Sequence, residues 1–264
     1  MCSWIRWGAR IAVGLAVLLG ATVSAAADID QIEACMRANV PKSLQVKTFE
    51  LIATDRSGGT RMLSGRLYGR LDQDLIEATL RIELPADLRG AAYLVREAES
   101  GKGEDMFVYL PALQKVRRIS GGMKDSPLFG TDLSYADVKQ IAYAFTDDSL
   151  KLEREDRLEE RPMWVLSMSP TPDNDSRFDR VEAWIDQQSC MVIKADFMQA
   201  GEVRKRFVSS ARHLAQSGPH WYVSQGRIED LQAQTHTDLR IVDVFSGQDL
   251  ADRLFNPRMF YLGP

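Results

Sequence analysis

The sequence has few of the residues from which metal and catalytic sites are usually built. Its three histidines are His213, His220 and His236, and none has zinc-ligand spacing to another histidine or to a cysteine. The chain also has no Gly-x-Ser-x-Gly motif, no Gly-x-Gly-x-x-Gly motif and no phosphate-binding loop. We therefore expect a protein with no metal and no cofactor, which is not an enzyme.

A hydrophobic run long enough to cross a membrane is also lacking. The longest apolar stretch, residues 11–23, has about 13 residues, whereas a spanning helix needs roughly 20. It follows two arginines and ends near Ala25 and Ala27, whose small side chains suit signal peptidase. The pattern predicts a signal peptide over residues 1–27 that is cleaved on export to the bacterial periplasm. The alternative interpretation is a membrane anchor.

Neither sign of charge is in large excess. The chain has 33 Lys and Arg against 37 Asp and Glu, which gives a net charge of −4 at pH 7. A nucleic-acid-binding protein would favour a basic face, so we expect no nucleic-acid partner. Because the sequence shows no repeat, low-complexity segment or linker, we expect residues 28–264 to form a single domain and the protein to be a monomer.

Cysteine is scarce, with three in the whole chain. Loss of a signal peptide would remove Cys2 and leave Cys35 and Cys190. In an oxidising compartment an even number of cysteines favours a disulfide, which would tie the N-terminal segment to a distant strand. The alternative is two separately buried thiols.

Most of the remaining chain has the two-residue period of β-strands. Over residues 75–84, apolar and polar side chains alternate, which predicts a strand with one buried and one solvated face. The residues assigned to its buried face are Ile76, Ala78, Leu80, Ile82 and Leu84. Further strands are expected over residues 45–55, 61–71, 89–96, 105–110, 150–158, 162–169, 178–186, 191–198, 202–213, 220–229 and 235–245.

Short turns and the absence of long intervening helices favour an antiparallel sheet. We predict a mainly β (α+β) fold, a curved, half-open antiparallel β-barrel of about 10–11 strands. An N-terminal helix is expected over residues 28–39 and a second helix over residues 134–143. Ser134 and Asp137 have the spacing of an N-cap pair at the start of the second helix. A short turn is expected over residues 249–255.

Residues 107–138 form the most distinctive stretch of the chain. An aromatic strand is followed by a compact positive cluster, which consists of Lys115, Arg117 and Arg118. A long loop over residues 120–132 comes next, and its apolar residues are Met123, Leu128 and Phe129. Long loops in compact domains are often lids or binding loops. The alternative is that these residues plug one end of the barrel as ordinary core.

Three motifs in this stretch resemble a known family. They are Tyr109-Leu110-Pro111-Ala112-Leu113, Val116-Arg117-Arg118-Ile119 and Phe129-Gly130-Thr131-Asp132-Leu133-Ser134-Tyr135-Ala136-Asp137. The motifs resemble the signature of the periplasmic outer membrane lipoprotein-sorting proteins, which are related to the lipoprotein carrier LolA and often accompany transporters of the RND/MMPL type. The resemblance implies an unclosed β-barrel with helices over its open face and an apolar cavity for acyl chains.

On this basis we expect a periplasmic carrier that binds a lipid or an acylated lipoprotein and passes it between inner-membrane machinery and the outer membrane. The expected lining and lid residues are Met106, Met123, Leu128, Phe129, Tyr135, Trp164, Trp184, Phe197 and Trp221, each of which could instead be ordinary core. The expected polar or partner contacts are Lys115, Arg117, Arg118, Asp132 and Asp137. The two arginines would meet a lipid phosphate or an acidic face of an RND/MMPL-type transporter. The alternative is that they form a solvated strand end. The alternative function is a periplasmic sensor or regulatory module on the same fold.

Overall fold

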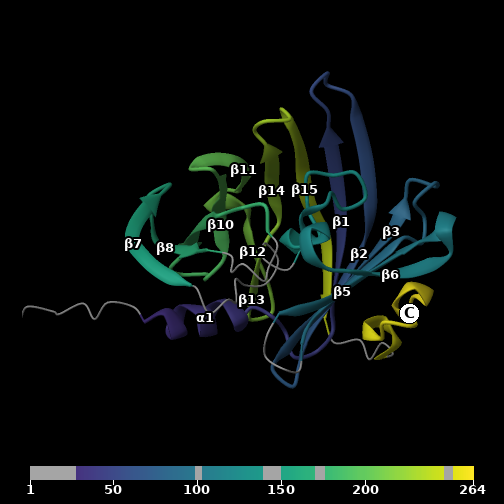
Figure 1. Ribbon diagram of the computed structural model, residues 1–264. Coiled ribbons are helices and arrows are strands. Elements are labelled where there is room, and N and C mark those ends of the chain that lie inside the picture. Colours follow the sequence, from purple (N-terminus) through teal and green to yellow (C-terminus); the bar gives the residue numbers. More distant parts are fainter. Residues whose placement is uncertain (1–27, 99–102, 139–149, 170–175, 247–251) are drawn as a thin grey trace, which may run out of the picture.

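The structure is a computed structural model that describes residues 28–98, 103–138, 150–169, 176–246 and 252–264 (Figure 1). The predicted signal peptide, residues 1–27, lies outside these residues. Within them, no helix is both long and apolar enough to cross a membrane.

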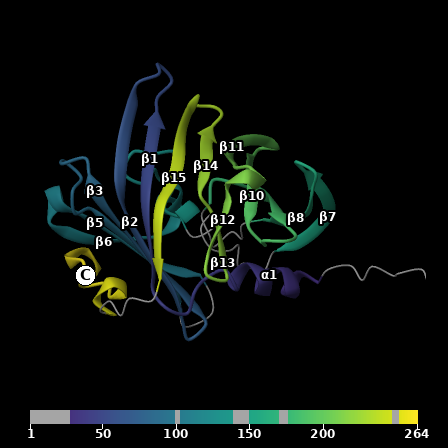
Figure 2. The same ribbon diagram turned by 180° about the vertical axis from the view of Figure 1, so that it is seen from behind.

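The described strands build one long, curved antiparallel sheet (Figures 1 and 2). Its strand order is β6-β5-β4-β3-β2-β1-β15-β14-β11-β10-β9-β8-β7, and its edges, β6 and β7, do not pair with each other. The strands of its first half are β1 (Gln45–Thr54), β2 (Thr60–Asp72), β3 (Leu75–Leu84), β4 (Ala92–Glu97), β5 (Glu104–Leu110) and β6 (Lys115–Ile119). Those of its second half are β7 (Lys151–Leu158), β8 (Arg161–Met168), β9 (Arg180–Asp186), β10 (Val192–Gln199), β11 (Glu202–Val208), β14 (Gln225–Asp230) and β15 (Thr235–Ser246).

The smaller elements lie around this sheet. The strands β12 (Leu214–Ser217) and β13 (His220–Val223) pair with each other as a separate hairpin. The helix α1 (Ile29–Arg37) precedes β1. The described 3-10 turns are η1 (Pro111–Leu113), η2 (Gly121–Asp125), η4 (Ala211–His213), η5 (Asp252–Phe255) and η6 (Phe260–Leu262).

The predicted fold class is confirmed: the protein is mostly β, with a curved antiparallel sheet that does not close. The sheet nevertheless has thirteen strands among the described residues, more than the 10–11 expected. One extra strand is β6, whose residues were expected only to form a positive cluster. The expected strand over 220–229 is broken at Ser224: β13 pairs with β12 in the separate hairpin, whereas β14 joins the large sheet. Alternation of side chains cannot reveal such a change of partner.

The main core lies on the concave face of the sheet. It takes alternate residues from each strand, and in β4 these are Tyr93 and Val95. In β3 the inward residues Ile76, Ala78, Leu80 and Ile82 are buried as expected. Leu84 is not, since it is 44% exposed at the end of the strand.

The C-terminal segment covers the opposite face of the first half of the sheet (Figure 2). Phe255 and Phe260 pack there against Tyr68 and Leu94. The Thr79 hydroxyl, which is fully buried, donates a hydrogen bond of 2.5 Å to the Leu254 carbonyl. The prediction of a solvated second face is therefore wrong for Thr79, because a segment 175 residues away in the chain shields it, whereas Glu83 on the same face is exposed.

The N-terminal helix is attached to the second half of the protein. The sequence predicts a Cys35–Cys190 disulfide, and it is present, with the two Cα atoms 5.8 Å apart. Asn39, just beyond the helix, donates to the Ser189 carbonyl at 2.7 Å and accepts from the Trp221 backbone N–H at 2.9 Å. The β12–β13 hairpin is thereby held beside α1.

The start of the helix expected over 134–143 has the predicted cap. The Ser134 N–H donates to the Asp137 carboxylate at 2.5 Å, and the Asp137 N–H donates to the Ser134 hydroxyl at 3.3 Å. These reciprocal bonds satisfy two N–H groups that a helix start leaves open. Residues 139–143 lie outside the described part of the chain, as do residues 249–251 of the other expected turn, of which η5 is described.

Candidate functional site

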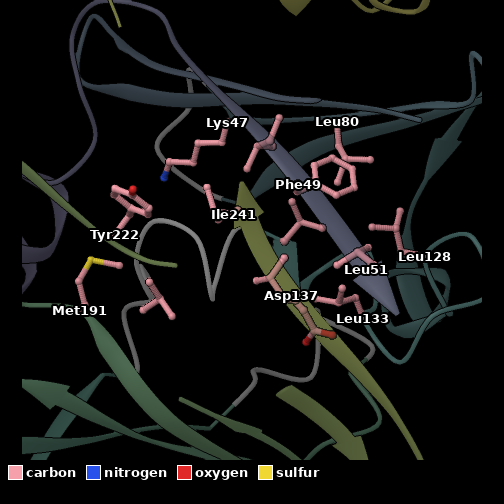
Figure 3. A pocket seen from close by; sticks show the side chains of 14 residues that line it. Lys47, Phe49, Leu51, Leu80, Leu128, Leu133, Asp137, Met191, Tyr222 and Ile241 are labelled. Atoms are coloured by element: carbon pink, nitrogen blue, oxygen red, sulfur yellow. The ribbon is translucent and has the colours of Figure 1, made fainter. Parts of the chain in front are cut away.

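An apolar hollow lies on the concave face of the sheet (Figure 3). Its floor comes from β1, β2, β3 and β15, and its cover comes from residues 128–138 and β13. The lining residues are Lys47, Phe49, Leu51, Leu67, Leu80, Leu128, Leu133, Asp137, Val138, Met191, Tyr222, Val223, Leu239 and Ile241. All but Lys47, Asp137 and the Tyr222 hydroxyl are apolar, so the hollow is suited to hydrocarbon.

Residues 120–138, which we call the strap, cross over one end of the hollow. Two aliphatic side chains of the strap, Leu128 and Leu133, are buried against the concave core and line the hollow. Pro127 and Ser134 form an isolated antiparallel β-bridge, so the strap folds back on itself. The strap is thus a compact cover with an apolar underside.

Asp132 fastens the strap to β15. Its backbone N–H donates to the Thr237 hydroxyl at 2.9 Å, and the same hydroxyl lies 2.7 Å from its carboxylate. The Thr235 hydroxyl also donates to this carboxylate. Thr237 is fully buried, so these bonds are shielded from water.

A buried ion pair fastens the strap to the other half of the sheet. The Asp137 carboxylate contacts the Lys205 ammonium on β11, and each side chain is 1% exposed. The Lys205 ammonium also lies 5.5 Å from the centre of the Phe197 ring. Between these two attachments, the Tyr93 hydroxyl donates to the Tyr135 carbonyl at 2.7 Å. Burial from water raises the pKa of the Tyr93 phenol well above its ordinary value, so the phenol remains a donor.

Lys47 brings a positive charge to the edge of the hollow. Its side chain is 7% exposed, and its ammonium lies 5.5 Å from the centre of the Tyr222 ring. Burial lowers the pKa of Lys47 from 10.5 to about 8, because the low-dielectric surroundings disfavour the charged form. The group nevertheless remains mostly protonated at neutral pH.

The hollow is small in this conformation. Water-sized molecules can occupy about 80 Å³ of it, whereas pockets for small-molecule ligands usually measure about 300–1,000 Å³. A long acyl chain would therefore have to displace part of the cover. The apolar residues of the strap are the side chains that such a chain would replace.

The structure brings only part of the predicted lining set to this hollow. Leu128 lines it, whereas Met106, Phe129, Tyr135 and Phe197 are buried elsewhere in the concave core. Trp164 and Trp221 are partly buried against that core without lining the hollow. Met123 is 46% exposed on the strap. Trp184 lies on the opposite face of the sheet with Met163 and Val165, which corrects its assignment as a lining residue.

The predicted polar contacts also divide into two groups. Lys115, Arg117 and Arg118 are exposed on the edge strand β6, where Arg118 forms an ion pair of 2.6 Å with Asp105. Asp132 and Asp137 instead bond within the protein as described above. Asp137 is buried, so in this conformation it cannot reach a protein partner on the surface.

Most residues that line the hollow were not predicted from the sequence, since the predicted set consists largely of aromatic residues. The hollow is bordered mainly by aliphatic side chains, since the aromatic rings fill the concave core nearby. Lys47, Phe49 and Leu51 alternate along β1, and this two-residue spacing is the signal that would have placed them on one face. Nothing in the local sequence indicates that Met191 and Tyr222 face them.

Within the described parts of the chain, no group of three or more His, Cys, Asp or Glu residues is arranged to hold a metal ion. The carboxylates at the hollow and strap accept hydrogen bonds or pair with lysine. The chemistry that the hollow supports is the binding of apolar chains.

Comparison with solved structures identifies the fold. A domain described as an outer membrane lipoprotein-sorting protein, from Vibrio parahaemolyticus, has 21% identity and a TM-score of 0.76, over 88% of this chain and 97% of that one. A DUF1329 family protein from Desulfovibrio piger has 21% identity and a TM-score of 0.73, over 85% and 94% of the two chains. A LolA superfamily protein from Nitrosomonas europaea has 17% identity and a TM-score of 0.65, over 88% and 98%. The resemblance predicted from the sequence is confirmed as a likeness of fold.

Among curated protein sequences, none matches this chain. One family model does match, over residues 76–260, and its description reads "uncharacterized protein". This range extends from β3 to the C-terminal segment and includes the strap and most of the large sheet. The chain belongs to that uncharacterized protein family, and its fold is that of the LolA-like lipoprotein-sorting proteins.

Proposed function

We propose that this protein is a periplasmic carrier that holds the acyl chains of a lipid or lipoprotein in its hollow. It receives them from inner-membrane machinery, such as an RND/MMPL-type transporter, and passes them towards the outer membrane. The observation that carries this proposal is the apolar hollow on the concave face, beneath a strap with an apolar underside. The secretory pattern of residues 1–27 supports the periplasmic location.

The energetics suit a carrier. Burying about 300 Å² of hydrocarbon stabilises a complex by roughly 7 kcal/mol, before the cost of immobilising the ligand and moving the strap. Hydrophobic contacts have little directionality, so the same cargo can leave when another apolar site is offered. No covalent step is needed.

The proposal is also supported by the descriptions of two solved structures that share this fold. They are described as an outer membrane lipoprotein-sorting protein domain and a LolA superfamily protein. Their likeness to this chain extends over 88% of this chain and over 97% and 98% of the two solved chains. In this proposal the strap of this chain is the cover that moves aside when a chain enters.

A binding experiment tests the hollow directly. Purified mature protein should increase the fluorescence of N-phenyl-1-naphthylamine, an uncharged probe that emits in apolar surroundings. Replacing Leu239 on the hollow floor with Trp fills the space and should weaken probe binding at least tenfold. The matched control is Leu231→Trp, since Leu231 is 41% exposed and lies outside the hollow.

The cargo itself is tested by extraction. Protein exported to the periplasm, purified without detergent and extracted with organic solvent, should release lipid that mass spectrometry detects. The Leu239→Trp variant should release much less of the same lipid than the Leu231→Trp control. Equal probe binding and equal lipid content in the two variants would contradict the proposal.

A further inference from the structure

A second pocket lies beside the C-terminal segment, on the face of the sheet opposite to the hollow, and it shares no lining residue with the hollow. Water-sized molecules can occupy about 420 Å³ of it, which is within the range of about 300–1,000 Å³ that is usual for small-molecule sites. Its charged side chains are Arg66 on β2, Arg81 and Glu83 on β3, and Arg89 in the turn after β3. We call it the arginine pocket.

Two of these arginines face each other across neighbouring strands. Arg66 and Arg81 are directly opposite in the register of β2 and β3, where like charges repel each other and destabilise a sheet. Arg66 forms an ion pair of 3.2 Å with Glu83, and both side chains are about half exposed. Arg81 and Arg89 form no ion pair with another described residue and donate to backbone carbonyls instead. A bound anion would relieve the repulsion.

The lining of the arginine pocket is positively charged as a whole. Three arginines against one glutamate give its side chains a net charge of +2. The sum stays positive even with a terminal carboxylate at Pro264, which also lines the pocket. A negatively charged ligand is therefore favoured over a neutral or positive one.

The C-terminal segment fixes the position of Arg81. The guanidinium donates through Nη1 to the Phe260 carbonyl at 3.3 Å and to the Tyr261 carbonyl. A Cβ atom on Gly263 would lie 3.0–3.3 Å from the guanidinium, so the backbone of the segment rests directly on it. Because Arg81 is already held in one orientation, it would lose little side-chain freedom on binding a ligand.

Tyr68 adds a buried hydroxyl to the same pocket. The residue is 2% exposed among the apolar side chains beneath the C-terminal segment, and it lines the arginine pocket. Within the described parts of the chain, its hydroxyl has no hydrogen-bond partner. Burying a hydroxyl without a partner is unfavourable. A ligand oxygen that accepts a hydrogen bond from Tyr68 would recover this loss.

We propose that the arginine pocket binds a phosphate monoester, whose oxygens accept hydrogen bonds from Arg66, Arg81, Arg89 and the Tyr68 hydroxyl. Guanidinium groups suit phosphate because each can present two parallel N–H groups to two oxygens. A phosphate monoester has a charge of about −1.5 to −2 at neutral pH, which matches the pocket, whereas a carboxylate has about half of it. The pocket is separate from the hollow, so its ligand does not depend on the proposed carrier function.

Calorimetric titration with glycerol 3-phosphate tests the pocket. The mature protein is titrated at neutral pH and physiological ionic strength. Glycerate, which has a carboxylate in place of the phosphate ester, is the comparison ligand. Glycerol 3-phosphate should bind about tenfold or more tightly than glycerate, because the phosphate can accept more charge-assisted hydrogen bonds from the arginines.

Variants of the exposed arginines locate the binding. Arg66→Gln, Arg89→Gln should weaken the binding of glycerol 3-phosphate about tenfold or more, since two charged donors are lost. The matched control is Arg56→Gln, Arg240→Gln, which makes the same charge change at exposed positions outside the pocket. The control should bind glycerol 3-phosphate as the wild type does.

Tyr68→Phe removes the buried hydroxyl and keeps the ring. It should weaken the binding of glycerol 3-phosphate about fivefold, as expected for the loss of one neutral hydrogen bond. Arg81 is left in place in all variants, because its bonds hold the C-terminal segment. Thermal unfolding of each variant verifies that the fold is retained.

Vesicles distinguish the two sources of a phosphate monoester. The protein is sedimented with phosphatidylcholine vesicles that contain or lack phosphatidic acid, a lipid whose head group is a phosphate monoester. Retention that requires phosphatidic acid, is lost in Arg66→Gln, Arg89→Gln and persists in the control would indicate a lipid head group. Binding of glycerol 3-phosphate without retention on vesicles would indicate a soluble phosphate ester.

Three results would overturn the proposed phosphate site. They are equal affinity of the wild type for glycerol 3-phosphate and glycerate, equal binding by the Arg66, Arg89 variant and its control, and no binding of either glycerol 3-phosphate or phosphatidic acid vesicles. The comparison of ligands uses the wild type and holds even if a variant folds poorly. None of these results bears on the hollow, whose probe and lipid are measured separately.

Discussion

Asp137 on the strap and Lys205 on β11 form an ion pair inside the protein, with 1% of each side chain exposed. The two residues are 68 positions apart in the chain, so their contact joins a covering segment to a strand of the distant half of the sheet. A buried pair of this kind tolerates the loss of both charges better than the loss of one, because a single substitution leaves the other charge buried and uncompensated.

We therefore expect Asp137→Asn to lower the free energy of unfolding by about 3–5 kcal/mol, measured by urea denaturation. The double variant Asp137→Asn, Lys205→Met should recover a large part of this loss. The control is Asp87→Asn, which breaks the exposed Arg61–Asp87 pair of 2.7 Å and should cost about 1 kcal/mol or less. A loss in Asp137→Asn no greater than that of the control would contradict this account.

Loss of the disulfide should destabilise the protein. The Cys35–Cys190 bond closes a loop with a sequence separation of 155 and ties α1 to the second half of the sheet. The double variant Cys35→Ser, Cys190→Ser should lose about 2–4 kcal/mol, since the unfolded chain gains freedom. Thermal unfolding with and without reductant provides the measurement. Reductant should lower the Tm of the wild type only, and a wild-type Tm that does not change would count against the bond.

Lys47 should make stability depend on pH in the alkaline range. Its pKa is about 8 in the folded protein and 10.5 ordinarily, so the folded state disfavours the proton. The Lys47 contribution is neutral above about pH 10.5, becomes unfavourable as pH falls to about 8, and is constant below that. It amounts to roughly 3 kcal/mol at neutral pH.

The measurement compares Lys47→Met with the wild type in urea at several pH values. The difference in unfolding free energy should shift in favour of the variant as pH falls from about 10.5 to about 8, and then level off. Lys42→Met should show no such trend. A difference that does not vary across this range would refute the assignment of the buried ammonium.

Charge reversal on β6 should affect delivery more than folding. Arg117 and Arg118 are exposed, and the Arg118–Asp105 pair is at the surface, so Arg117→Glu, Arg118→Glu should cost about 1 kcal/mol or less in stability. Uptake of fluorescent fatty acid from inner-membrane vesicles of the producing bacterium should fall several-fold if these residues meet an anionic partner. The control, Lys42→Glu, Arg56→Glu, has the same charge change at other exposed positions. Parallel losses of Tm and uptake in the β6 variant would argue against a docking role.

Local sequence patterns were sufficient for several elements. The alternation over residues 75–84 corresponds to β3, since side chains in a strand face opposite sides in turn whatever the rest of the chain does. The Ser134–Asp137 cap is equally local, because its two hydrogen bonds span three residues. The apolar residues of the 120–132 loop likewise indicated that this loop packs against the rest of the protein, and Leu128 and Phe129 are buried in the concave core.

Contacts between segments far apart in the chain decided the features that local patterns could not predict. Whether Thr79 faces water depends on the C-terminal segment that accepts its hydrogen bond, and no pattern within β3 contains that information. The break at Ser224 depends on which partner each flanking strand finds. The sequence by itself thus determined the β architecture, the covering segment and the cysteines available for pairing. Only the tertiary structure decided which side chains border the hollow and that Lys47 is among them, because unfilled space depends on packing between strands far apart in the chain.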